Sequence, residues 1–113
     1  MKRSNKLFTE DILDSIEKIE RYTKELNYED FIENQMVVDA VIRNLEIIGE
    51  ASNNLSKELR SKFSDIPWKR MIGLRNIVVH GYFGIDLSII WEIITKNLPD
   101  TKPDIIEMNN KIK

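Results

Sequence analysis

The chain has 113 residues, the usual size of one domain with one core, so we expect a single domain over residues 1–113. Hydrophobic residues make up 42% and charged residues 32%, which is typical of a globular protein and excludes a disordered or fibrous chain. With no cysteine and one histidine, the sequence excludes disulfides, thiolate nucleophiles and a structural zinc site within one chain.

The formal net charge of −2 conceals an uneven distribution of charged residues. Residues 57–75 carry six basic and two acidic side chains, within an otherwise acidic chain. Such a segment is compatible with a phosphate-bearing partner, and equally with a solvated helix face. No apolar run approaches the roughly 18 residues that span a bilayer, and no secretory signal is recognisable, so we expect a cytoplasmic protein without a membrane partner.

Apolar residues recur at helical spacing through the first half of the chain. Thr9 can cap a first helix that runs to about Thr23. Asn27 introduces a short element, Tyr28 to Glu33, and a long helix follows from about Met36 to Leu55. The long helix has a core-facing stripe of Val37, Val41, Leu45, Ile48, Ala51 and Leu55.

The second half continues as short helices over residues 56–63, 67–79, 86–98 and 103–112. Ser56 and Asp86 are the expected caps, and Pro67 suits the first helical position. Gly81 and Gly84 break the second of these helices, Pro99 ends the third and Pro103 starts the last. No strand pair is predicted, so the fold class is an all-α, up-down bundle of four to five helices.

Gly49 lies inside the long helix, where glycine costs up to about 1 kcal/mol relative to alanine. It indicates close approach of another helix, within the chain or across a dimer, unless it is simply tolerated there. The larger aromatic residues fall at core-compatible positions, and we interpret Trp68, Trp91, Phe31 and Phe63 as packing residues and not as platforms for stacking bases.

One segment, from Arg75 to Tyr82, concentrates polar side chains within an apolar run. Arginine can bind a phosphate bidentately and stabilise the charge of a transition state. Histidine titrates near neutral pH and can act as a general base or acid, and Asn76 can orient it or bind a phosphate oxygen. These residue types suit phosphodiester chemistry without a metal.

The spacing limits how these residues can cooperate. On a straight helix Asn76 and His80 lie about 40° apart, whereas Arg75 and His80 lie about 140° apart. Either the helix relaxes near Gly81, or two chains supply residues to a shared cleft. The structural alternative is a salt bridge for Arg75, a helix-end His80 and a packed Tyr82.

The spacing Arg75-x4-His80-x-Tyr82 resembles the R-x4-H-x-Y motif of HepT-like toxins, a branch of the HEPN superfamily. The resemblance covers nearly the whole chain. The segments that carry it are Asp39 to Ala51, Ile66-Pro67-Trp68, Ile72 to Asn76, Tyr82 to Asp86 and Trp91 to Ile94.

The resemblance implies a HEPN-like homodimer in which two motifs form a composite endoribonuclease site that needs no metal or other cofactor. Arg75 and His80 would be catalytic on RNA, and Asn76 would support them. The implied partner is an MntA-like minimal nucleotidyltransferase antitoxin, which would silence the toxin by AMPylation of Tyr82.

Two alternatives remain open from the sequence. The chain can be a non-catalytic HEPN module that binds nucleotides or docks a nucleotidyltransferase, or a purely structural helical dimer. Glu46 and Glu50 lie one turn apart on the long helix and can line the dimer cleft. They can equally pair with Arg43 and Lys57.

Overall fold

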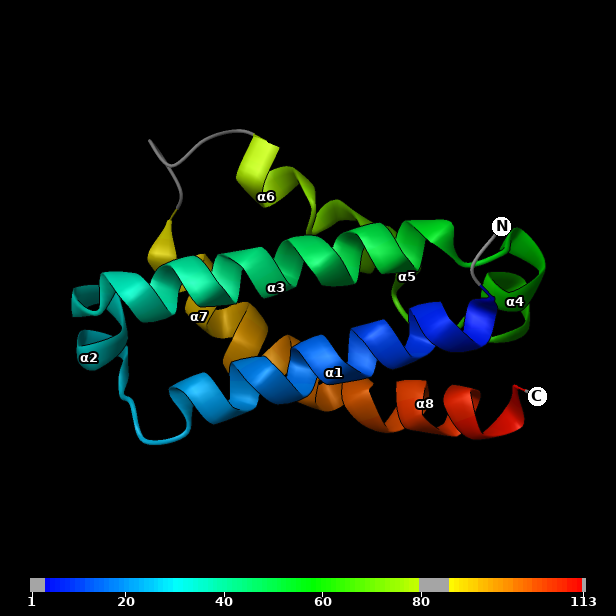
Figure 1. Cartoon of the computed structure of the whole chain (residues 1–113), viewed down its shortest axis with the longest axis horizontal. Helices are drawn as coiled ribbons and strands as arrows, with labels where there is room; N and C mark the ends of the chain where they lie inside the picture. The colour runs from blue at the N-terminus through cyan, green and yellow to red at the C-terminus, as the bar shows by residue number, and fades with distance from the viewer. Residues whose placement is uncertain (1–3, 80–85, 113) are drawn as a thin grey trace.

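The protein is an all-α bundle, as predicted, and a computed structural model describes residues 4–79 and 86–112. No strand occurs among these residues. The helices are, in chain order, α1 Asn5–Thr23, α2 Tyr28–Glu33, α3 Gln35–Asn54, α4 Lys57–Lys62, α5 Trp68–Gly73, α6 Asn76–Val79, α7 Leu87–Glu92, the π-helix η1 Ile93–Asn97 and α8 Leu98–Lys111. Figure 1 shows α3 lying along α1, with α2 and α4 at opposite ends of this pair.

The caps explain most of the helix boundaries. The predicted cap at Thr9 is wrong: Ser4 caps α1 by accepting from the Leu7 N–H, and Thr9 lies buried inside the helix. The hydroxyl of Thr9 instead donates to the carbonyl of Asn5, so its polar group is satisfied within the helix. The predicted caps Ser56 and Asp86 are confirmed for α4 and α7, and Asn27, expected only to introduce the short element, caps α2.

The last helical run departs from the prediction. Pro99 does not end a helix and Pro103 does not start one, because α8 runs through both prolines. The preceding turn is a π-helix, in which the Leu98 N–H donates five residues back to the Ile93 carbonyl. This wider turn accommodates Pro99 in the first turn of α8, where a missing N–H costs little.

The buried apolar residues form one core between α1, α3, α5 and the run from α7 to α8. The stripe predicted for α3 is confirmed, since Val41, Leu45 and Ile48 are fully buried. Phe31 is also fully buried and contacts the ring of Trp91, with 5.2 Å between ring centroids. Trp68 is buried and its indole N–H donates to the Phe63 carbonyl, so the aromatic residues pack as predicted.

Polar contacts join the first and last helices of the bundle, which lie beside each other in Figure 1. The Lys6 ammonium donates to the Asn109 carbonyl at 2.9 Å, and Lys102 forms an ion pair with Glu20 at 2.7 Å. Between these two contacts, Ile105 and Met108 of α8 are fully buried. The fold is therefore closed by its C-terminal helix.

Candidate active site

Arg75 lies in a turn between two short helices and not on a continuous one. The single helix predicted from Pro67 to Val79 is wrong, because α5 ends at Gly73 and α6 begins at Asn76. Pro67 is the residue that precedes α5 instead of its first residue. The N–H groups of Leu74 and Arg75 donate three residues back, to Met71 and Ile72, so the chain tightens at the break.

Gly49 of α3 holds this turn against the long helix. A β-carbon at Gly49 would lie 2.4 Å from the Arg75 backbone nitrogen and 2.9 Å from the Arg75 β-carbon. Only glycine leaves room for such an approach. The close contact predicted at Gly49 is therefore present within the chain, and its partner is the backbone of Arg75.

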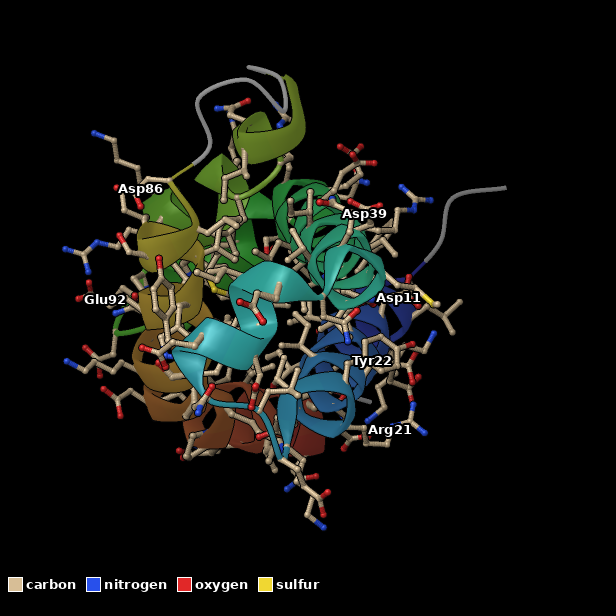
Figure 2. All side chains as sticks on the ribbon, turned by 90° about the vertical axis from the view of Figure 1, so that its left-hand side faces the viewer. Asp11, Arg21, Tyr22, Asp39, Asp86 and Glu92 are labelled. Carbon is tan, nitrogen blue, oxygen red and sulfur yellow. The ribbon has the colours of Figure 1, made fainter. Side chains whose placement is uncertain are left out.

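The turn borders an open cleft of about 800 Å³. Its lining comes from α1, α3 and the Arg75 turn: Phe8, Asp11, Arg43, Glu46, Ile47, Glu50, Ala51, Asn54, Arg75 and Asn76. Figure 2 shows Asp11 of α1 and Asp39 of α3 projecting from one side of the bundle, whereas Asp86 and Glu92 project from the opposite side. The cleft thus brings together four of the predicted site residues, namely Arg75, Asn76, Glu46 and Glu50.

Both arginines of the cleft are paired with carboxylates. Glu50 Oε2 lies 3.3 Å from Arg75 Nη1, and Glu46 pairs with Arg43 as the sequence suggested. The suggested pairing of Glu50 with Lys57 is wrong, because the Arg75 turn packs directly against this part of α3 and Lys57 lies beyond its end. The Arg75 side chain remains 39% exposed, so its guanidinium can exchange the carboxylate for a phosphate group from solvent.

His80 and Tyr82, together with Gly81 and Gly84, lie outside the described residues. Their geometry relative to Arg75 stays a prediction, and so does the catalytic role of the whole set. Sequence reasoning did not place Phe8 or Asp11 in the site. The signal for α3 was available, because residues 43, 46, 47, 50 and 54 recur at helical spacing on one face.

The described part of the chain has neither a membrane-spanning helix nor a candidate metal site. No helix in residues 4–79 and 86–112 is long and apolar enough to cross a membrane. Within the same ranges, no group of three or more histidine or acidic side chains is placed to hold a metal ion. The expectation of a metal-independent reaction is not tested by this.

Comparisons with known proteins converge on one family. The family model "Ribonuclease HepT-like" matches residues 12–108. Over 104 residues the chain is 47% identical to "Putative RNase MJ1380" of Methanocaldococcus jannaschii, which covers 92% of this chain and 95% of that protein. It is 42% identical over 102 residues to "Probable ribonuclease HepT" of Thermococcus cleftensis, covering 90% of this chain and 93% of the relative. No solved structure matches.

Proposed function

We propose, because this chain belongs to the HepT-like ribonuclease family, that it is an endoribonuclease and the toxin of a toxin–antitoxin system. The observation that carries the proposal is the placement of Arg75 and Asn76 on the rim of an open cleft, held there by Gly49. The family match spans α3, the Arg75 turn and α6, which line the cleft, and all but the first turns of α1.

The chemistry follows from the residue types of the motif. In RNA the 2′-hydroxyl can attack the adjacent phosphorus, so the enzyme needs no nucleophile of its own. His80 accepts the 2′-hydroxyl proton, and the 5′-oxygen leaves with a proton from a general acid. Arg75 binds the non-bridging oxygens, where negative charge develops in the transition state, and Asn76 supports this contact. The products are a 2′,3′-cyclic phosphate and a 5′-hydroxyl.

A homodimer supplies the second proton-transfer group. In this proposal one His80 acts as the base and the partner's His80 acts as the acid, which is the reason for a composite site. A mixed dimer with one His80→Ala chain is then nearly inactive. Half of the parent's activity in that mixed dimer would show that each chain works alone.

The test of the function is cleavage of messenger, ribosomal and transfer RNA by the purified protein in excess EDTA. The preparation contains no antitoxin, and mass measurement confirms an unmodified Tyr82. We expect cleavage by the parent protein and none by His80→Ala. If neither protein cuts any RNA, the chain is instead a HEPN module that binds nucleotides or docks a nucleotidyltransferase.

Control of the toxin is proposed to act at Tyr82. Transfer of AMP from ATP to this tyrosine, by an MntA-like minimal nucleotidyltransferase, places a bulky anion two residues from His80. The anion competes with RNA phosphate for Arg75 and obstructs the cleft. Tyr82→Phe is expected to cut RNA as the parent does and to escape inhibition by the co-expressed antitoxin. Continued inhibition of that variant would exclude Tyr82 as the regulated residue.

A further inference from the structure

A basic surface lies on α4, α5 and the segment between them, and it shares no residue with the lining of the cleft. It is a shallow groove of about 660 Å³, which we call the α4–α5 groove. Its lining residues are Lys57, Arg60, Ser61, Ser64, Ile66, Pro67, Trp68 and Lys69. Figure 1 places α4 at the end of the bundle where both described chain ends also lie.

The cations of this groove have no carboxylate partners. Lys57 and Lys69 are exposed, and neither side chain forms an ion pair or hydrogen bond with any described residue. The Nε of Arg60 is buried and has no acceptor within the described structure. Arg60 is half-buried and its guanidinium forms no ion pair with any described residue, so no carboxylate offsets its charge.

The acidic residues of the same segment do not neutralise the groove. Glu58 is 3.9 Å from Lys62 on α4, and neither of these two lines the groove. Asp65 is exposed and is also absent from the lining. The groove therefore presents three positive charges from its own walls and no negative charge.

The other lining groups suit contacts with the phosphates of a nucleic acid better than contacts with its bases. Ser61 and Ser64 supply hydroxyls that can donate to phosphate oxygens. Trp68 is not available for base stacking, because it is buried and its indole N–H is already bonded to the Phe63 carbonyl. A ligand in this groove is thus recognised by its charge, independently of its sequence.

The groove is also close to the cleft along the chain. Lys69 is on α5, and Arg75 follows six residues later, in the turn directly after this helix. We propose that the α4–α5 groove binds the sugar–phosphate backbone of the RNA substrate, a few nucleotides from the scissile bond. This inference rests on the proposed ribonuclease function and adds a binding surface outside the catalytic motif.

The test measures binding of a labelled single-stranded RNA by fluorescence anisotropy, on a His80→Ala background so that the RNA stays intact. The groove variant is Lys57→Gln with Lys69→Gln. The matched control is Lys24→Gln with Lys96→Gln, two exposed lysines that have no ion pair in the described structure and lie outside the groove. Thermal melting by circular dichroism checks that both variants stay folded.

We expect the groove variant to bind RNA about tenfold more weakly near 0.1 M salt. The slope of log affinity against log salt concentration becomes shallower by about 1.4, the value for two lost phosphate contacts on a single strand. The control variant keeps the parent affinity, and with His80 restored the groove variant shows a raised KM. Equal affinity of the groove variant and the parent overturns the inference while cleavage by the parent still supports the function. Loss of antitoxin binding alone would assign the groove to the protein partner and overturn it as well.

Discussion

In the cleft between α1, α3 and the Arg75 turn, each arginine is paired with a glutamate, whereas Lys57, Arg60 and Lys69 of the α4–α5 groove have no acidic partner among the described residues. The same segment of sequence supplies Arg75 and the groove cations. Paired charges add little to the attraction of a distant anion, but they can be exchanged at short range. If the proposed function holds, we therefore expect the groove to attract RNA and the cleft to supply the chemistry.

The largest effect is expected for Arg75→Ala. Loss of a group that stabilises transition-state charge lowers cleavage by about 10²- to 10³-fold. The affinity for intact RNA falls severalfold at most, because the substitution changes the cleft by one charge and leaves Glu50 without its cation. Single-turnover assays measure the loss of cleavage, and fluorescence anisotropy on the His80→Ala background measures the change in RNA affinity. A parallel tenfold loss of affinity would show that the cleft, like the groove, attracts RNA.

Gly49→Ala is expected to disturb the cleft by displacing the Arg75 turn that packs on α3. The added β-carbon would overlap the Arg75 backbone, at 2.4 Å from its nitrogen, so the turn must shift. Overpacking of this kind costs about 1–3 kcal/mol of unfolding free energy, and displacement of Arg75 lowers cleavage by up to about 10²-fold. Denaturant unfolding and cleavage assays measure both, while RNA binding in the groove is unaffected.

Gly73→Ala is the matched control for that substitution. A β-carbon at Gly73 would meet no atom within 4 Å, and the residue is helical. Alanine there is neutral or stabilises the protein by up to about 1 kcal/mol. Equal destabilisation by the two substitutions would contradict the role given to the Gly49 contact.

Glu50→Gln is expected to leave Arg75 without a carboxylate partner, like the cations of the α4–α5 groove. Both partners of the ion pair are well exposed, so the free energy of unfolding changes by less than about 1 kcal/mol. The released charge of Arg75 raises the affinity for RNA severalfold. The slope of log affinity against log salt concentration becomes steeper by about 0.7, the value for one added phosphate contact. Glu107→Gln, which removes a pair with Lys111 elsewhere on the molecule, serves as the control. Unchanged affinity would argue against competition between Glu50 and phosphate.

The smallest effect is the pH dependence of thermal stability due to Asp86, which lines neither the cleft nor the groove. Hydrogen bonds from the Ser88 hydroxyl and backbone N–H lower the pKa of the Asp86 carboxyl below its ordinary value. A carboxyl with a lowered pKa in the folded state stabilises the protein above its unfolded pKa, and this contribution is lost as the pH falls through the lowered value. Melting temperatures of Asp86→Ala and the parent should therefore differ at pH 7 and converge in acid. A constant difference would mean that the carboxylate charge is not involved.

Local patterns predicted the long helices well. The apolar stripe located α3 to within a residue at each end, and two of the expected caps, Ser56 and Asp86, are present, because both signals act within a few turns of the chain. The errors had local causes, such as Ser4 in place of Thr9 as the cap of α1, as well as contacts between distant segments. The break at Leu74 and Arg75 depends on packing against Gly49, and the π-helix before Pro99 has no recognisable sequence signal.

The candidate site was predicted by residue type and not by position. Arg75 and Asn76 stood out as polar residues in an apolar run, and both lie at the cleft. The pairing of Arg75 with Glu50 could not be predicted, because 25 residues separate them and the sequence offered Lys57 as a nearer cation. Asp11 was missed for the same reason, since only the packing of α1 on α3 brings it to the site.

The contact between α1 and α8 also determines the order in which the protein can fold during its synthesis. Lys6 and Asn109 are 103 positions apart, so their bond cannot form until the segment that carries α8 has left the ribosome. Every described element of the cleft precedes α8 and is synthesised earlier. Until α8 has been synthesised and packs on α1, apolar surface of α1 stays exposed to water. A translation product that stops before α8 therefore lacks part of the burial that stabilises the bundle.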